Sequence, residues 1–230
     1  MLTTALALLT AHLLADYPLQ NGWIIANKKK PAAMAVHIGV VFLLTLLALR
    51  GEIWPALTIA ALHLGIDLIK THWAPDTLAA YIADQLAHFA TLAVVFWVWP
   101  GLGDLWPEAT PFVQYLLTIT AGFILCVLAG GPAIGLLMKD FTTGIQDSLP
   151  NAGKMIGLLE RSVIFLLVLA GHPAGVGFLI AAKSILRFDK DPKASEYVII
   201  GTLASFGWAL LISFATLSLI TFYGIDPTPS

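Results

Sequence analysis

Charged residues and cysteines are scarce in this chain. Only 11% of its 230 residues are charged, whereas a soluble domain carries about 25%. The single cysteine, Cys126, has no partner for an internal disulfide and excludes sites that need several thiolates. The 12 basic and 14 acidic residues are scattered and form no basic patch, so we expect no nucleic-acid partner. The H-E-x-x-H motif of zinc proteases and the G-x-S-x-G motif of serine hydrolases are both absent.

Apolar residues dominate the sequence instead. They make up 58% of it, and the mean hydropathy is +0.86. A particle of 24.6 kDa cannot bury this much apolar surface inside itself, so lipid must surround much of the chain. The sequence therefore predicts an all-α, polytopic membrane helix bundle.

Eight apolar runs are separated by charged residues or by proline and glycine. They cover residues 2–24, 32–49, 55–72, 78–99, 112–138, 155–170, 174–187 and 196–223. A membrane-spanning helix needs about 20 residues. The runs at 155–170 and 174–187 are short, and they could instead form a re-entrant hairpin around Gly171-His172-Pro173. We therefore expect seven or eight transmembrane segments.

Basic residues orient these segments, because cytoplasmic loops are enriched in Lys and Arg. If the lysine clusters are cytoplasmic, nine of the 12 basic residues lie on one side: Lys28, Lys29, Lys30, Lys70, Lys139, Lys154, Arg187, Lys190 and Lys193. Both termini then lie outside, and we expect a multi-pass protein of the bacterial inner membrane. Its expected parts are a four-helix domain (1–100), an extracytoplasmic loop (101–111), C-terminal membrane helices (112–223) and a disordered tail (224–230).

Histidine and aspartate interrupt the first four apolar runs. An Asp at a helix centre costs about 2.5–3.5 kcal/mol on insertion scales, so Asp16, Asp67 and Asp84 each need a partner, a proton, water or a cation. Two triads repeat 51 positions apart, each as H-x-x-x-D followed by a second His 25 positions after the first: His12, Asp16, His37 and His63, Asp67, His88. We interpret them as a tandem repeat of a helix hairpin, with both copies running in the same direction.

These polar residues also fall at one depth in the predicted topology. At about 1.5 Å rise per residue, they form a layer roughly 8–15 Å inside the cytoplasmic boundary. Imidazole and carboxylate without thiolate suit Zn²⁺, with Mn²⁺ or Fe²⁺ as alternatives. We predict that the two triads bind one or two such ions. Asp84 is then free to act as a general base or to bridge two metals, while Gln20 and Gln85 would hydrogen-bond to the ligands.

A structural interpretation remains open for the same residues. His–Asp pairs between membrane helices contribute about 0.6–2 kcal/mol each as hydrogen bonds, and they could simply hold the bundle together. His72, beside Trp73 at a segment end, and His172, in a tight turn, are expected at the membrane interface.

The C-terminal half carries basic residues near its expected cytoplasmic face. Arg161, Lys183 and Arg187 could converge on an anionic lipid headgroup or substrate. Alternatively, these side chains extend to phospholipid headgroups, or Arg161 pairs with Glu160 or Glu196 and is structural.

The segments HLLADYPLQ, HLGIDLIK and DQLAH, with Trp23 and His37, resemble the bacterial and phage membrane-protein family called domain of unknown function 3307. This resemblance covers about the first hundred positions. GKMIGLLER, AAKSILRF and SEYVIIGTLASFGWA resemble a C-terminal extension of some members. The resemblance implies a membrane protein but no activity, so function must be argued from the site.

The ligand pattern favours an intramembrane metal-dependent hydrolase that acts near the cytoplasmic leaflet on a lipid or lipid-linked substrate. A divalent-cation or proton-coupled transporter is the alternative, since the same layer could be a binding site midway across the membrane. A third interpretation is a non-catalytic membrane anchor or partner-binding subunit. Membrane lipids are the expected partners, together with a second copy of the chain or another membrane protein.

Overall fold

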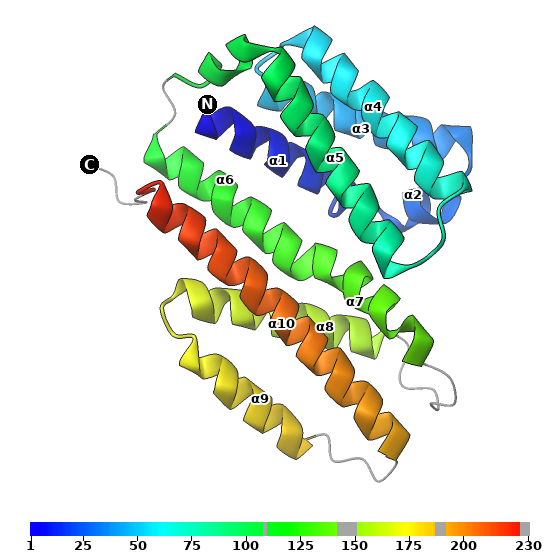
Figure 1. Ribbon diagram of the computed structural model, residues 1–230, viewed down its shortest axis with the longest axis vertical. Coiled ribbons are helices and arrows are strands. Elements are labelled where there is room, and N and C mark those ends of the chain that lie inside the picture. The colour runs from blue at the N-terminus through cyan, green and yellow to red at the C-terminus, as the bar shows by residue number, and fades with distance from the viewer. Residues whose placement is uncertain (108–109, 142–150, 187–191, 226–230) are drawn as a thin grey trace. The chain divides into compact units, whose positions relative to one another are not determined.

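A computed structural model describes residues 1–107, 110–141, 151–186 and 192–225. The described residues contain helices and no strand (Figure 1), which confirms the predicted all-α class. Five helical stretches are long and apolar enough to cross a membrane: Pro31–Ala48, Ile53–His72, Leu78–Val98, Pro111–Phe141 and Ser195–Phe222. Leu2–Asp16 and Ala174–Lys183 are shorter apolar helices. The chain is an integral membrane protein by this criterion of length and composition.

The chain divides into two compact units. Unit 1 comprises Met1–Ala121 with Gly224 and Ile225, and unit 2 comprises Gly122–Tyr223. Unit 1 holds α1 (Leu2–Asp16), α2 (Gly22–Asn27), α3 (Pro31–Ala48), α4 (Ile53–His72), α5 (Leu78–Val98), a short 3-10 helix (Pro100–Asp104) and most of α6 (Pro111–Phe123). Unit 2 holds the π-helix Ile124–Ala129, α7 (Gly130–Met138), a 3-10 turn (Lys139–Phe141), α8 (Ala152–Leu169), α9 (Ala174–Leu186) and α10 (Pro192–Phe222).

Local sequence explains where the helices of unit 1 begin. Pro31 occupies the first turn of α3, where its missing N–H costs no hydrogen bond. The Thr77 side chain accepts a hydrogen bond from the Ala80 N–H and caps the start of α5. Because of these signals, α3 and α5 begin within one residue of the starts of the predicted apolar runs.

The first helix differs from its prediction, since it ends at Asp16 and not near residue 24. Pro18 lacks an N–H to donate to the preceding turn, and its ring would clash with a continued helix. The chain then turns, and the Asn21 side chain accepts a hydrogen bond from Ile24 N–H at 3.0 Å to start the separate helix α2. Gln20 consequently lies on a connection and not on the first membrane helix.

Unit 1 is built on an antiparallel series of long helices. α1 packs on α3, α3 on α4, and α4 on α5, and α5 also contacts α1. Figure 1 shows these four helices, coloured from blue to green, lying alongside one another. An apolar core occupies one end of the series: Ala7, Leu8, Ala11, Ala48, Leu49, Ala56, Ile59, Val95 and Leu102. The opposite end holds the histidines and aspartates.

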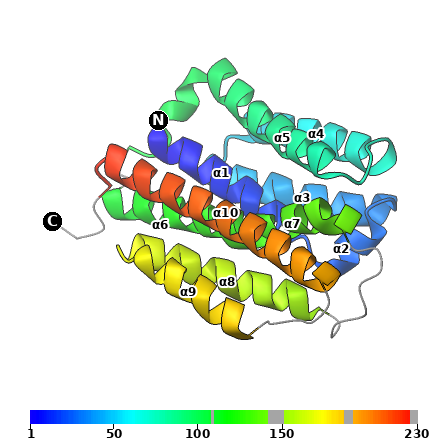
Figure 2. The same ribbon diagram turned by 60° about the horizontal axis from the view of Figure 1, so that its bottom comes forward.

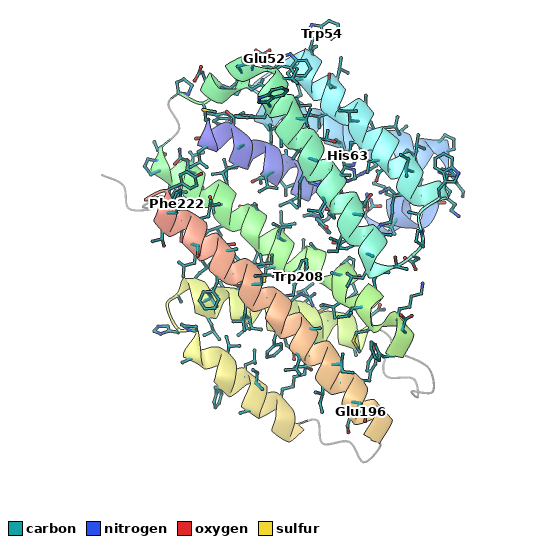
Figure 3. The ribbon with its side chains drawn as sticks, in the orientation of Figure 1. Glu52, Trp54, His63, Glu196, Trp208 and Phe222 are labelled. Atoms are coloured by element: carbon teal, nitrogen blue, oxygen red, sulfur yellow. The ribbon has the colours of Figure 1, made fainter. Side chains whose placement is uncertain are left out.

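Large apolar side chains cover the outer faces of the helices. Leu47 is 71% exposed on α3, and Trp97 is 81% exposed near the end of α5. Trp54 points outward from the start of α4 (Figure 3). An all-round apolar helix surface is typical of helices surrounded by lipid.

In unit 2, α10 packs mainly on α8 and also contacts α7 and the π-helix. Figures 1 and 2 both show α9 beside α8. Between α8 and α9, Gly171 adopts a left-handed φ of 76° and His172 N–H donates to Leu167 O at 2.8 Å. This is the usual glycine-dependent end of a helix, and it places the break where the sequence predicts one.

Candidate metal centre in the N-terminal unit

The four predicted histidine ligands come from four different helices of unit 1. His12 lies on α1, His37 on α3, His63 on α4 and His88 on α5. Because consecutive long helices run antiparallel, the C-terminal parts of α1 and α4 meet the N-terminal parts of α3 and α5. All four side chains are buried, with exposed fractions between 0 and 4%.

His63 is the centre of this group and is labelled in Figure 3. Its ring centroid lies 4.1 Å from that of His88, 5.2 Å from that of His37 and 5.5 Å from that of His12. The rings of His12 and His88 are stacked at 5.2 Å. The structure therefore brings together the histidines of both sequence triads.

Two carboxylates complete the group. The Nε2 atoms of His37 and His63 are 3.2 Å apart. Asp67 Oδ2 lies 3.2 Å from the first and 3.6 Å from the second. Asp16 Oδ1 lies 3.5 and 3.3 Å from the same two nitrogens. The result is two triangles of possible ligand atoms that share the edge between His37 and His63.

The size of these triangles fits a small divalent ion. Ligand atoms about 2.0–2.1 Å from a tetrahedral Zn²⁺ are about 3.3 Å from one another, close to the separations of 3.2 to 3.6 Å in both triangles. Overlapping sets whose ligand atoms lie within 4.8 Å of one another are His12, Asp16, His63; His37, His63, Asp67; and Asp67, Asp84, His88. Every predicted metal ligand belongs to at least one set.

Several polar atoms of the cluster are buried and make no hydrogen bond within the described structure. They are His12 Nε2, Asp16 Oδ1, Asp67 Oδ2, Asp84 Oδ1 and His88 Nε2. A buried polar atom left unsatisfied costs about 1–3 kcal/mol. A cation would satisfy these atoms together, since each is a lone-pair donor in the neutral imidazole or the carboxylate.

One histidine is oriented for metal binding by its own backbone. His88 Nδ1 lies 2.9 Å from Asp84 O. A carbonyl only accepts, so Nδ1 carries the proton and Nε2 of the neutral ring presents a lone pair to the cluster. Hydrogen bonding of the remote ring nitrogen in this way is common among metal-binding histidines.

Asp84 lies at the more accessible edge of the cluster. Its side chain is 10% exposed, against 2% for Asp67. Gln85 Nε2 donates to Asp84 Oδ2 at 3.2 Å, and Lys70 Nζ is 3.9 Å from the same oxygen. Asp67 belongs to two of the possible ligand sets, whereas Asp84 belongs to one. The geometry thus puts Asp67, and not Asp84, in the position between two possible ions.

The other predicted hydrogen-bonding residue, Gln20, contacts a ligand directly. Its Nε2 lies 3.2 Å from His37 Nε2. His72, on the same helix as His63, is exposed and turns back to the Leu68 carbonyl at 3.1 Å, away from the cluster. His172 is exposed in unit 2.

Lys28 is a cluster residue that sequence reasoning placed only in a cytoplasmic loop. Its Nζ lies 2.9 Å from Asp67 Oδ1, and its side chain is 22% exposed. The sequence offered a clue to this pair, because a buried Asp near the end of a membrane helix needs a cation and three lysines follow α2. The turn before α2 decides which of the three lysines reaches Asp67. The sequence pattern did not predict this turn.

Two tyrosines were also missed. Tyr17 and Tyr81 share a hydrogen bond between their hydroxyls at 2.6 Å, and Tyr17 donates to Gln85 Oε1 at 3.1 Å. Lys70 Nζ lies 5.6 Å from the Tyr81 ring centre. Tyr81 precedes Asp84 by three residues on α5 and so shares its helix face, whereas Tyr17 follows Asp16 directly, just after the end of α1.

The predicted basic residues of the C-terminal half lie in unit 2. Arg161 is buried on α8, and Lys183 on α9 pairs with Glu160 at 2.6 Å. Arg187 lies outside the described residues. Glu160 therefore neutralises Lys183 and not Arg161, contrary to the pairing that would have made Arg161 structural.

Comparison with known proteins gives one match. Residues 4–116 match the model of a family described as a protein of unknown function, DUF3307. The matched range contains every His and Asp of the cluster, and it ends before the C-terminal segments that resemble an extension. No curated protein and no solved structure matches the chain.

Proposed function

The N-terminal half of the chain belongs to the DUF3307 family of proteins of unknown function, and we propose from its buried cluster that this membrane protein is a metal-dependent hydrolase. It holds one or two divalent ions, with Zn²⁺ favoured, and acts near the cytoplasmic leaflet on a lipid or lipid-linked substrate. The observation that carries the proposal is the pair of triangles around His37 and His63, built from both copies of the sequence repeat.

Charge balance supports a cation in this cluster. Asp16 and Asp67 lie in ion-pair range of the same two histidines, whereas Lys28 is the one basic side chain paired with either carboxylate among the described residues. With neutral histidines, one negative charge remains buried without a partner. A buried unpaired charge is strongly unfavourable in a membrane protein, so a bound cation, a protonated histidine or a protonated aspartate must remove it, and a divalent ion is the option that also satisfies the histidine nitrogens.

The donor set favours zinc, manganese or iron over calcium and magnesium. Imidazole nitrogen suits the transition metals, while Mg²⁺ and Ca²⁺ prefer oxygen ligands alone. The set His37, His63, Asp67 would hold one ion, with Asp16 or His12 as a further ligand. With this one ion bound, Asp84 is not a ligand and stays free to act as a base. The set Asp67, Asp84, His88 could hold a second ion, and Asp84 would then be a ligand instead.

Hydrolysis needs an activated water and a base. A bound divalent ion would supply Lewis acidity and would activate water as a nucleophile. Asp84 fits the base, because its Oδ1 is unpaired and it is the least buried carboxylate of the cluster. Asp84 would take the proton of water, the remaining hydroxide would attack the ester carbonyl or phosphoryl centre, and the alcohol would leave with a proton. Gln85 would hold the other oxygen of Asp84 in place.

The alternative function is cation or proton transport. The observation that favours it is burial, since His37 is completely buried and His63 and His88 are each 2% exposed. A substrate would have to reach this depth, whereas a transported ion needs only a narrow path. Transport and hydrolysis use the same ligands, so an experiment must separate them.

The Asp84→Asn substitution separates the two functions. The purified protein would be reconstituted with a membrane lipid extract and Zn²⁺, and released products would be followed by mass spectrometry. We expect the wild type to release product and Asp84→Asn to keep its metal but to lose at least about a hundredfold in turnover, the usual contribution of a general base. Asp76→Asn, an exposed aspartate before α5, is the matched control.

Two other outcomes would contradict the hydrolase proposal. If the wild type releases no product but carries Zn²⁺ into sealed vesicles, and His63→Ala abolishes this uptake, the hydrolase proposal fails and transport replaces it. If the protein binds metal but does neither, the centre is structural.

A further inference from the structure

Arg161 in unit 2 is a buried cation that pairs with no carboxylate in the described part of the chain. It is 4% exposed. Its Nε and Nη2 both donate to the Val127 carbonyl, at 3.1 and 2.9 Å, and its Nη1 donates to Ser205 Oγ at 3.2 Å. Among the described residues, no carboxylate oxygen lies within ion-pair distance of this guanidinium, because Glu160 is held by Lys183 at 2.6 Å.

The local fold is shaped around this guanidinium. Val127 lies in the π-helix Ile124–Ala129, and π-helical turns in membrane and soluble proteins often mark functional sites. A Cβ added at Gly157 would lie 2.9 Å from Arg161 Nη1, and one at Gly130 would lie 3.0 Å from Arg161 Cδ. Two glycines thus give the side chain the space that it occupies.

Arg161 borders a cavity of about 570 Å³ that lies entirely within unit 2. Its polar lining consists of Arg161, Lys154, Tyr197, Thr202, Ser205 and the Lys183–Glu160 pair. The remaining lining is mostly aliphatic, with Val127, Ile134, Met138, Ile156 and Val198 among its members. A cavity with a cationic part and a mostly aliphatic wall suits a ligand that has an anionic group and an apolar chain.

The electrostatics favour an anion over a neutral guest. The Lys183–Glu160 pair is neutral, so Arg161 and Lys154 leave the lining with a net positive charge. A guanidinium has more N–H donors than its three bonds to Val127 and Ser205 use. Phosphate and carboxylate oxygens are the acceptors that this geometry binds best.

We propose that this cavity binds a phosphate group against Arg161, carried by a membrane lipid whose acyl chain lies along the aliphatic wall. Lys154 lies on the same lining and would contribute a second positive charge. The inference is independent of the metal centre, since all of its residues belong to unit 2. A free phosphate ion shares the headgroup chemistry but would leave the aliphatic wall unused.

The test is native mass spectrometry of the whole delipidated protein in mild detergent. Phosphatidylglycerol and diacylglycerol with the same acyl chains are the lipid probes, the second without a phosphate, and inorganic phosphate is the free-ion probe. We expect phosphatidylglycerol to bind the wild type and to bind Arg161→Gln roughly tenfold or more weakly, the loss expected for a charge-assisted hydrogen bond. Lys29→Gln removes an exposed positive charge in unit 1 and should bind like the wild type.

A second variant leaves Arg161 untouched and covers the case in which Arg161→Gln fails to fold. Gly135 lines the cavity, and a Cβ added there meets nothing within 4 Å, so Gly135→Leu should fill the cavity and weaken phosphatidylglycerol binding. Gly177, on α9 and also with nothing within 4 Å of an added Cβ, is not among the lining residues and gives the control Gly177→Leu.

The outcomes separate the two sources of phosphate. Displacement of phosphatidylglycerol by inorganic phosphate in the wild type, with no preference for the lipid, would assign the site to the free ion. Equal binding of phosphatidylglycerol and diacylglycerol, which lacks a phosphate, would overturn the proposal. So would wild-type affinity for phosphatidylglycerol in a folded Arg161→Gln or Gly135→Leu protein.

Discussion

Asp67 is the most constrained side chain of the buried cluster. Its Oδ2 faces His37 and His63, its Oδ1 accepts from Lys28 at 2.9 Å, and only 1% of the residue is exposed. Each oxygen therefore has a distinct role. Lys28 balances one carboxylate charge without occupying the oxygen that faces the histidines, so this oxygen stays free for the proposed metal.

Replacing Lys28 tests this division of roles. In the metal-free protein, Lys28→Met leaves Asp67 buried without its cation, and we expect a loss of about 1–3 kcal/mol in the free energy of unfolding. The added metal should then recover most of this loss, because the carboxylate gains a cation again. Thermal unfolding in detergent, with chelator and with Zn²⁺, measures both effects.

Lys29→Met is the control for Lys28, since Lys29 is an exposed neighbour with no ion pair to the cluster among the described contacts. Equal melting temperatures for the two variants in chelator would contradict the role given to Lys28. A Zn²⁺-induced stabilisation that is no larger in Lys28→Met than in the wild type would do the same.

At the scale of single residues, the sequence identified the histidines and aspartates that cluster but not their neighbours. His12, His37, His63 and His88 stand out because polar groups in apolar runs are costly, and a repeated spacing marks them as a set. Lys28 stands in an ordinary polar loop, where nothing in the pattern distinguishes it from the two lysines that follow. Its role depends on a turn that brings it back to α4.

Among the helices, small residues decide how closely neighbours approach. In unit 2, a Cβ added at Gly122 would lie 2.7 Å from Thr216 Cγ2 and 3.1 Å from Thr216 Cβ on α10. Thr216 itself is tied to the Ile212 carbonyl by a hydrogen bond of 2.8 Å. Glycine thus permits contact between the end of α6 and α10 that a larger residue prevents.

The Gly122→Ala substitution should therefore destabilise the protein by about 1–3 kcal/mol, as overpacking does. The sign is diagnostic, because alanine in place of glycine normally stabilises a helix by about 0.5–1 kcal/mol. Adding Thr216→Ala, which removes the atoms nearest the new methyl group, should recover part of the loss. A double-variant cycle of melting temperatures measures the coupling, and a stabilising Gly122→Ala would show that the two helices do not pack at this position.

Helix positions were largely predictable because hydropathy and breaking residues coincide. The runs at 32–49, 55–72 and 78–99 match α3, α4 and α5 within two residues at each end. The failure at Tyr17 to Asn21 has a physical reason. Apolar residues lie on both sides of that segment, but Pro18 and the cap at Asn21 break the helix, and an average over a long window does not register them.

At the scale of the whole molecule, the two units carry different chemistry. Unit 1 contains the buried histidines and aspartates and the whole of the family match, whereas unit 2 contains Arg161 and its cavity. The apolar core of unit 1 fills one end of the bundle and leaves the other end to the cluster. The same helices thus form an apolar core at one end of unit 1 and the polar cluster at the other.

The tandem repeat explains why a closed group of ligands forms in unit 1. Each copy contributes one long helix with a His and an Asp, followed by a helix with a second His. Both triangles share the edge between His37 and His63, and these two residues come from different copies of the repeat. Neither copy could therefore form a triangle alone. The spacing predicted that the two triads would face each other. Only the packing of the helices shows that His37 and His63 are the residues in contact.

The most direct test of a metal centre is the metal content of the detergent-purified protein, measured by inductively coupled plasma mass spectrometry without chelator. We predict one to two equivalents of zinc, manganese or iron per chain in the wild type, lost in His63→Ala, Asp67→Ala and kept in His72→Ala, which removes the exposed histidine of the same helix. A folded wild type without metal would contradict the account. The 3.2 Å contact between His37 and His63 would then be a hydrogen bond that holds the bundle together.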